Sequence, residues 1–244
     1  VTSRVQIGLS DEWFYPVNGL GFSSEHEVNL ESAVITSDAL KLFETCARRA
    51  KARFSFHASR EQMLRLCELV GGMPLALELA ASWLHVLPLD AVIEELEKSS
   101  KILRSRHHDV AERHRDMQAV LEGSWQLLSP ERQTFAAQLS VFRGSFSRQA
   151  AEAVTGATLF SLATLVEKSF LSVTESGRFE QHPLLHRYAQ EKLSESAKGR
   201  SLKDAHSLYY LEKLADWNAQ LKTQERKHVL PTITLELANV RAAW

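Results

Sequence analysis

The sequence predicts a mainly α-helical protein that contains one small β-hairpin. Apolar residues recur at helical spacing through most of the 244 residues. Helix starts and ends are marked in these stretches by residues that favour them: serine, threonine, proline and glycine. Two strand-like runs, 170–174 and 178–181, flank the turn Glu175-Ser176-Gly177. We therefore expect a helical bundle, then a winged-helix domain that includes the hairpin, and then a further pair of helices.

Composition places the chain among globular proteins without a dominant charge. Apolar residues make up 44%, and 29 basic and 30 acidic residues give a net charge of −1. Such a balance creates no bulk field for nucleic acid or acidic membranes. Cys46 and Cys67 lie in apolar helical patterns and are interpreted as buried thiols. We see no signal peptide and no apolar run that could span a bilayer, so we expect a cytoplasmic protein.

The bundle is predicted over residues 37–103, with about four helices. Ser37 is a plausible N-cap for a helix that carries Leu40, Phe43 and Ala47 at helical spacing. The string Ser59-Arg60-Glu61-Gln62 predicts a capping box for the next helix. Asp90 is expected to cap a helix from Ala91 to about Leu103.

A tight corner is predicted in the middle of this bundle. Gly71 and Gly72 should end one helix, because glycine accepts the left-handed conformation found at helix ends. Pro74 should begin the next, where its fixed φ and missing N–H suit the first turn. Free N–H groups at a buried helix start can receive a phosphate or a polar ring edge. From the residues alone, a plain helix-turn-helix corner is the competing interpretation.

Residues 104–116 read as a charged, solvated linker, and a compact pattern resumes at Met117. The histidines of the linker match no metal-ligand spacing, so no metal site is predicted. Four helices are expected in the next domain: 117–128, 130–139 after Ser129, 148–154 after Ser147, and 159–168 after Thr158. The hairpin follows, and Pro183 opens a closing helix. This order is typical of a winged helix.

The side chains of the expected recognition helix do not favour DNA reading. Residues 159–168 contain one Lys, one Glu and no Arg, Asn or Gln, the side chains that usually read base edges. A winged helix that does not bind specific DNA is therefore the preferred interpretation, and a DNA-binding regulator is the alternative. The two helical stretches in 202–244 resemble one tetratricopeptide-like unit. We interpret them as the start of an array that binds a protein partner or effector.

The string from Gly71 to Ala81, GGMPLALELAA, resembles the Gly-x-Pro motif of the signal-transduction ATPases related to the NB-ARC family. The strings Ser124-Trp125, Val141-Phe142 and 165–169 are similar to the winged-helix subdomain of the bacterial members. The resemblance implies five segments. These are 1–36, the end of a nucleotide-binding domain; 37–103, a helical subdomain; 104–116, a linker; 117–200, a winged-helix subdomain; and 201–244, the start of the repeats.

Three residues receive nucleotide-contacting roles from this resemblance. Arg4, in Thr2-Ser3-Arg4, matches the sensor that reaches the terminal phosphate. Pro74 matches the proline beside the adenine. His182, in Gln181-His182-Pro183, occupies the place of the family's Met-His-Asp motif, whose histidine contacts the β-phosphate of ADP. The methionine and aspartate of that motif are absent here.

The sequence contains no Gly-x-x-x-x-Gly-Lys-Ser/Thr phosphate loop and no Mg²⁺-holding acidic strand end, which phosphoryl transfer needs. We therefore predict no catalytic residues in this chain and no tight binding of ATP or ADP by it alone. Val1 and Trp244 both fall inside structured patterns, so we expect a piece of a longer protein. In that parent, the resemblance implies a preceding phosphate-loop domain, a slow ATP/ADP switch and self-oligomerisation in the active state. A protein-interaction module without nucleotide is a further alternative.

Overall fold

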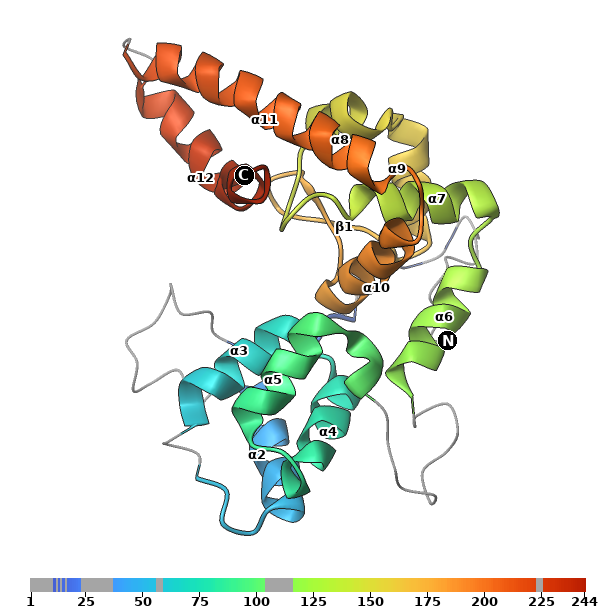
Figure 1. The fold of residues 1–244 in the computed structure, drawn as a ribbon, viewed down its shortest axis with the longest axis vertical. Helices are drawn as coiled ribbons and strands as arrows, with labels where there is room; N and C mark the ends of the chain where they lie inside the picture. Colours follow the sequence, from blue (N-terminus) through green and yellow to red (C-terminus); the bar gives the residue numbers. More distant parts are fainter. Residues whose placement is uncertain are drawn as a thin grey trace. The chain divides into compact units, whose positions relative to one another are not determined.

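The computed structural model describes residues 11, 13, 15, 17–22, 37–55, 59–103, 116–222 and 226–244 (Figure 1). These residues are mainly helical and include one two-stranded antiparallel sheet, so the predicted fold class is confirmed. The chain divides into two compact units, one formed by Phe14–Leu127 and the other by Val1–Trp13 with Leu128–Trp244. The predicted sensor stretch around Arg4 and linker residues 104–115 lie outside the described residues.

The unit Phe14–Leu127 is a helical bundle. Helix α2 packs on α3 and α4, and α3 packs on α5. Its core side chains, among them Phe43, Met63, Leu66 and Leu77, are fully buried, as expected when apolar helix faces meet. Its α-helices are α2 (Asp38–Ala50), α3 (Arg60–Val70), α4 (Pro74–Ser82), α5 (Leu89–Lys98) and α6 (Met117–Gln126), with short 3₁₀ turns η2 (Trp83–His85) and η3 (Ser100–Ile102).

Helix caps in this unit agree only in part with the sequence predictions. Ser37 is the N-cap of α2, and its side chain accepts a hydrogen bond from the Leu40 N–H at 3.4 Å. The capping box predicted at Ser59 is wrong: its side chain makes no capping bond, and its backbone, at φ −117° and ψ 11°, is not extended as an N-cap usually is. Asp90 is not the cap of α5 either. Pro88 holds that position, Asp90 lies in the first turn, and the helix ends at Lys98.

The other unit contains the last three of the four helices predicted for the winged-helix domain, followed by the hairpin and the closing helix. The first of the four, α6, belongs to the bundle unit. Strands β1 and β2 pair antiparallel, with Val173 opposite Phe179, and are shorter than the predicted runs. Phe146 extends the pairing, because it exchanges two backbone hydrogen bonds with Phe179, at 2.8 and 2.9 Å. The elements are α7 (Pro130–Leu139), α8 (Arg148–Thr155), α9 (Leu159–Glu167), β1 (Ser172–Val173), β2 (Phe179–Glu180) and α10 (Pro183–Ser194).

Helix starts in this unit follow the predicted residues. Ser147 caps α8 and accepts from the Ala150 N–H at 3.1 Å. Thr158 caps α9 in a capping box with Ser161. Pro130 is the first residue of α7 as predicted, but Ser129 makes no side-chain capping bond.

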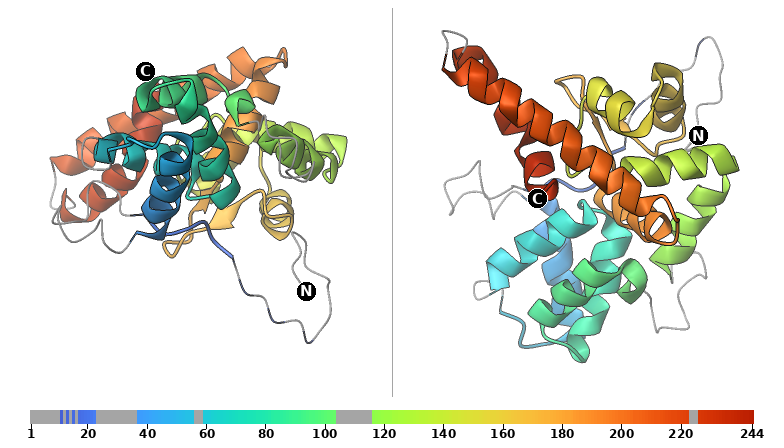
Figure 2. Two further views of the ribbon diagram at one scale, coloured as in Figure 1. Left: turned by 90° about the horizontal axis from the view of Figure 1, so that it is seen from below. Right: turned by 45° about the horizontal axis from the view of Figure 1, so that its top comes forward.

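Helices α11 (Gly199–Leu221) and α12 (Arg226–Ala242) form a hairpin at the end of the chain. Helix α11 packs on α12 and also on α8, so the hairpin is seated on the predicted winged helix (Figures 1 and 2). Pro231 lies inside α12, where it removes one helical hydrogen bond. Among the described residues, no helix combines the length and the apolar character that crossing a membrane requires.

Candidate functional site

The Gly71–Pro74 corner in the bundle has the predicted geometry. Gly71 and Gly72 both take left-handed backbone conformations, with φ of 60° and 64°. Their N–H groups return to the last turn of α3, where Gly72 N–H donates to the Cys67 carbonyl at 3.0 Å, as in a glycine-terminated helix end. Pro74 is the first residue of α4. Its side chain is exposed at the start of that buried helix, so the residue predicted to contact adenine is accessible.

Residues 19–21, which we call the connector, cross this corner so closely that the two backbones are in contact. The Leu20 N–H donates to the Gly72 carbonyl at 2.8 Å. A Cβ at Gly19 would lie 2.1 Å from the Gly71 carbonyl oxygen, and one at Gly72 would lie 2.2 Å from the Leu20 oxygen. A side chain does not fit at such distances, so both Gly19 and Gly72 must be glycine for the two segments to cross.

The connector is also fixed to the start of α2. The Gly21 carbonyl accepts from the Ser37 hydroxyl at 3.0 Å and from the Ala39 N–H at 3.3 Å. One short segment therefore ties the start of α2 to the start of α4. We call this arrangement, Gly19–Gly21 against Gly71–Gly72, the connector crossing. Sequence reasoning identified the corner but missed its partner, although Gly19 and Gly21 flanking an apolar residue were a signal.

His182 in the other unit is the N-cap of α10. Its Nδ1 accepts a hydrogen bond from the Leu184 N–H at 3.3 Å, and Pro183 is the first helical residue. The half-buried ring therefore has a structural task, whatever else it contacts. Pro183 suits its place as the first residue of the helix, because its fixed φ and missing N–H fit the first turn.

His186 lies one turn further along α10 and faces the protein interior. Its Nε2 lies 2.8 Å from the Phe142 carbonyl oxygen. Burial lowers the pKa of His186 to about 4, although hydrogen bonding to the Phe142 carbonyl opposes this shift. At neutral pH the ring is therefore uncharged, and its Nε2–H donates to the carbonyl. No group of three or more His, Cys, Asp or Glu side chains that could hold a metal ion occurs in the part of the chain that the structure describes.

A buried ion pair joins the hairpin turn to the last helix. Arg178, which immediately precedes β2, has a guanidinium nitrogen 2.7 Å from a carboxylate oxygen of Glu236 on α12. Both side chains are buried, with exposed fractions of 9% and 7%. Arg178 also donates to the hydroxyl and to the carbonyl of Ser145, each at 2.9 Å. Burying two charges is favourable only when their hydrogen bonds are satisfied in this way.

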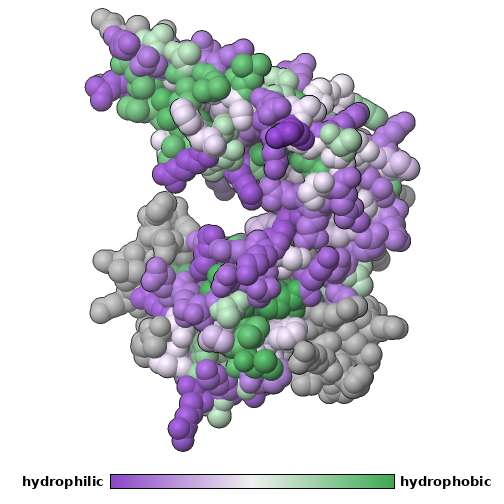
Figure 3. Space-filling view, in the orientation of Figure 1, coloured by the Kyte–Doolittle hydropathy of each residue, from purple (hydrophilic) through white to green (hydrophobic). Residues whose placement is uncertain are grey.

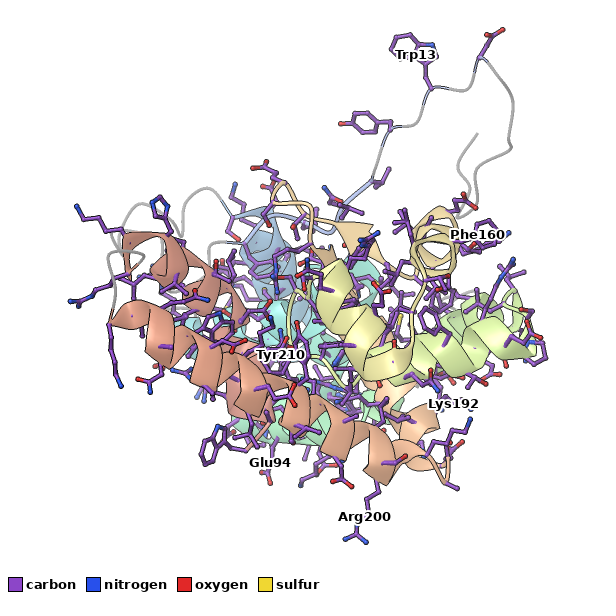
Figure 4. The ribbon with its side chains drawn as sticks, turned by 90° about the horizontal axis from the view of Figure 1, so that it is seen from above. Trp13, Glu94, Phe160, Lys192, Arg200 and Tyr210 are labelled. Atoms are coloured by element: carbon purple, nitrogen blue, oxygen red, sulfur yellow. The ribbon has the colours of Figure 1, made fainter. Side chains whose placement is uncertain are left out.

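Two further residues, Tyr210 and Asn239, complete this polar cluster. The Tyr210 hydroxyl donates to Glu236 at 2.8 Å, and the Asn239 amide donates to the Ser145 carbonyl at 2.9 Å and to Glu236 at 3.1 Å. The Asn239 side-chain oxygen accepts from the Arg143 N–H at 2.7 Å. Tyr210 projects from α11 toward the interior (Figure 4), and burial beside the Glu236 carboxylate raises its pKa. We call Arg178, Glu236, Tyr210, Asn239 and Ser145 the polar cluster.

His206 borders the polar cluster without a hydrogen bond for its Nε2. The ring packs edge-on against Phe142 and lies 4.8 Å from the Tyr210 ring, measured between centroids. Burial lowers the pKa of His206 to about 4, against the raising effect of Glu236. The histidine is therefore a neutral packing residue at physiological pH. Neither the polar cluster nor His206 was predicted from the sequence; Glu236 and Asn239, three residues apart in a largely apolar helix, were the available signal.

The surfaces that a DNA-binding winged helix would use are poor in exposed cations. The wing's only arginine, Arg178, is buried in the ion pair. Helix α9 exposes Leu159 and Phe160, at 58% and 78%, and Phe160 projects from the edge of the unit in Figure 4. Exposed apolar groups and Glu167 replace the basic or amide side chains that read base edges.

Predicted site residues fall in different parts of the chain. Pro74 belongs to the bundle and His182 to the other unit, and Arg4 lies outside the described residues. Their predicted roles toward a nucleotide therefore stay predictions.

Comparison with known proteins gives distant bacterial relatives. No known family profile matches the chain. Uncharacterized proteins of Mycobacterium tuberculosis and Mycobacterium bovis are 30% identical over 190 residues, which is 72% of this chain and 48% of theirs. The chain thus spans about half the length of these relatives.

Longer mycobacterial proteins are also similar. A Mycobacterium tuberculosis protein named "Putative HTH-type transcriptional regulator" is 26% identical over 236 residues, 92% of this chain and 26% of its own length. The similarity of the chain is therefore to a protein named as a transcriptional regulator. That name mentions neither an ATPase nor a nucleotide.

Proposed function

We propose that this chain is the lid-and-sensor portion of a bacterial signal-transduction ATPase that switches between ADP- and ATP-bound states and regulates transcription. The connector crossing is the observation that carries the proposal. It holds Gly19–Gly21, from the segment that the resemblance places at the end of the nucleotide-binding domain, against the corner that resembles the family's Gly-x-Pro motif. Pro74 is exposed at the end of that arrangement, where a flat apolar ring could pack on it.

Each of the three residues is proposed to contact a different part of the nucleotide. Pro74 packs beside the base, His182 donates to the β-phosphate and Arg4 reaches the terminal phosphate. The phosphate loop and the Mg²⁺ ligands, which bind and activate the triphosphate, come from a preceding domain of the parent. This chain itself has no enzymatic activity. ADP then stabilises one conformation of the parent and ATP another, because the two nucleotides contact these residues differently.

Nucleotide binding separates this proposal from an interaction module that uses no nucleotide. The 244-residue chain alone should show no calorimetric binding of ADP, whereas the natural full-length protein should bind it. In that full-length protein, His182→Ala should speed ADP release by roughly tenfold to a hundredfold, the effect of losing a charge-assisted hydrogen bond of about 1.5–3 kcal/mol. If the variant melts at a lower temperature but releases ADP at the wild-type rate, His182 serves only as the α10 cap.

A DNA-binding regulator is the second candidate, favoured by the similarity to the longer mycobacterial protein that is named as an HTH-type transcriptional regulator. Its test is a selection on random DNA duplexes with the 244-residue chain. We expect no consensus sequence, because α9 and the wing expose few cations and no base-reading amides. A consensus, with affinity that falls steeply as salt rises, would establish the second candidate in place of the first.

A further inference from the structure

Helix α2 ends in a run of positive charge that few acidic groups oppose. Between Glu44 and Glu61 the sequence contains five lysines and arginines and no acidic residue. Four of these cations are exposed where α2 ends: Arg48, Arg49, Lys51 and Arg53. We call these four residues the basic turn. In the space-filling view, hydrophilic surface lies over the end of the bundle at which α2 stops (Figure 3).

The basic turn has an anchored backbone. Lys51, the residue after α2, is extended at φ −143° and ψ 98°, and its N–H donates to the Ala47 carbonyl at 2.8 Å. The Phe54 N–H then donates to the Lys51 carbonyl at 2.9 Å. The Phe54 ring packs edge-on against the buried Phe43, with 6.2 Å between the ring centroids. The exposed side chains of Lys51 and Arg53 are therefore presented from a turn that is fixed at both ends.

Stabilisation of the helix end explains only part of the basic turn. Cations in the last turn of a helix interact favourably with its partial negative charge, and this effect falls off beyond that turn. Arg48 and Arg49 lie in the last turn of α2, but Arg53 lies three residues beyond Ala50, the last helical residue. Four like charges within six residues also repel one another. The free protein therefore gains no stability from the charge of Arg53.

Acidic groups oppose only part of this charge. Glu44 forms an ion pair with Arg48 at 2.6 Å. Burial raises the pKa of the Cys46 thiol, Glu78 adds to that rise and Arg49 opposes it, so the charges of Glu78 and Arg49 act on the same thiol. Within the described ranges, however, no carboxylate lies within ion-pair distance of Arg49 or of the two cations beyond the helix. Three cations of the basic turn thus form no ion pair with a described residue.

The chemistry of the basic turn fits phosphate groups spaced along a nucleic-acid backbone. Three of its four cations are arginines, whose planar guanidinium groups bind phosphate oxygens in pairs. Only alanines lie between these cations, whereas protein interfaces and membrane-surface segments combine charge with aromatic or aliphatic anchors. Binding by charge alone is characteristic of non-specific contact with DNA, whose duplex carries one negative charge per about 1.7 Å.

We propose that the basic turn binds the phosphate backbone of duplex DNA without regard to base sequence. Phosphate contacts position a protein on a duplex and carry no sequence information. The proposal is therefore compatible with α9, which exposes apolar groups in place of base-reading side chains. It concerns the bundle and not the winged helix, and it depends neither on a bound nucleotide nor on the proposed ATPase parent.

Fluorescence anisotropy of a labelled DNA duplex, titrated with the 244-residue chain at several salt concentrations, tests the proposal. The logarithm of the association constant should fall linearly with the logarithm of the salt concentration. Its slope should be about −2.7, because each of the three cations without an ion pair contributes about −0.9. A threefold rise in salt should thus weaken binding about twentyfold. No binding at about 20 mM salt, or an affinity that does not change with salt, would overturn the proposal.

Single substitutions assign the contact to the basic turn. Arg53→Gln should make the slope shallower by about 0.9 and weaken binding at about 20 mM salt by roughly tenfold or more. Arg53→Lys, which keeps the charge, should retain the slope. Arg200→Gln is the matched control, because Arg200 is also an exposed arginine near a helix end and projects from the edge of the other unit in Figure 4. It should bind as the wild type does; a loss as large as in Arg53→Gln would indicate attraction by the whole chain and overturn the assignment.

Two further measurements separate DNA binding from other roles of these charges. Arg53→Gln should melt at the wild-type temperature or slightly above it, because removing one of several like charges relieves repulsion. A lower melting temperature with unchanged DNA affinity would mean that Arg53 serves the fold alone. Vesicles of phosphatidylcholine and phosphatidylserine in equal parts should not sediment the chain at the salt concentration at which the duplex binds. Binding to these vesicles that is tighter than binding to the duplex would assign the basic turn to membranes and overturn the proposal.

Discussion

Replacing Arg178 by methionine should destabilise the unit that contains the hairpin and the terminal helices. The substitution removes the 2.7 Å ion pair with Glu236 and both hydrogen bonds to Ser145, and it leaves the carboxylate buried with only two neutral donors, from Tyr210 and Asn239. Removing one partner of a buried pair costs about 3–5 kcal/mol. For a protein of this size, that corresponds to a melting temperature lower by about 6–20 °C.

Urea unfolding measured by circular dichroism, combined with amide hydrogen exchange, gives both the size and the place of the loss. We expect α11 and α12 to lose protection while α2–α5 keep it, because the polar cluster belongs to one unit only. Arg143→Met is the matched control. That arginine lies in the loop beside Ser145 but its side chain is exposed, so the change should stay within about 0.5 kcal/mol.

A double-mutant cycle provides the result that would refute this reasoning. Arg178→Met with Glu236→Leu removes both charges, so the double variant should be more stable than the sum of the single losses predicts, by about 2 kcal/mol or more. Strict additivity, or a loss in Arg178→Met no larger than in Arg143→Met, would mean that the pair does not hold the terminal hairpin on the wing.

The remaining predictions concern the connector crossing and the buried histidine. Gly72→Ala should lower the free energy of unfolding of the bundle by at least about 2 kcal/mol in urea titrations. The reason is that the φ of Gly72 is positive and an added Cβ would meet the backbone of Leu20. Gly21→Ala is the control and should be near neutral, because a Cβ there meets nothing within 4 Å. His206 holds its proton less tightly when folded, with a pKa of about 4 against 6.5 when unfolded, so stability should fall as pH drops from 6.5 to 4. His206→Phe should reduce that fall in the free energy of unfolding by up to about 3 kcal/mol and leave the part that comes from His186. An unchanged pH dependence of stability in His206→Phe would contradict the conclusion that burial lowers the pKa of His206.

Elements marked by local chemistry could be predicted from the sequence. Prolines at the first helical position placed the starts of α4, α7 and α10, and Ser147 and Thr158 placed α8 and α9. These signals work because a cap or a proline acts on its own helix end, with no help from the rest of the fold. Ser59 and Asp90 misled because each has the residue type of a cap without its geometry: the backbone of Ser59 is not extended, and Asp90 lies in the first turn of α5 behind Pro88.

Contacts between distant residues could not be predicted in the same way. The connector crossing joins Leu20 to Gly72, and the polar cluster joins Arg178 to Glu236. A single sequence carries no pairing information over such separations, so Arg178 appeared to be an ordinary wing residue. Its burial agrees with the preferred interpretation that the winged helix does not bind specific DNA, because the buried Arg178 is not available to approach a phosphate. In the sequence, Glu236 is a charged residue among largely apolar helix positions, and that pattern does not identify Arg178 as its partner.

The affinity of the natural full-length protein for ADP tests the central claim most directly, with Pro74→Ala compared against Pro130→Ala. Both prolines are exposed first residues of a helix, so the two changes should affect stability alike. If Pro74 packs beside the base, calorimetry should show ADP binding weakened by about tenfold in Pro74→Ala, the loss of roughly 1.4 kcal/mol of apolar contact, and unchanged in Pro130→Ala. Equal affinities in the two variants, or no ADP binding by the wild-type protein, would contradict the proposed function.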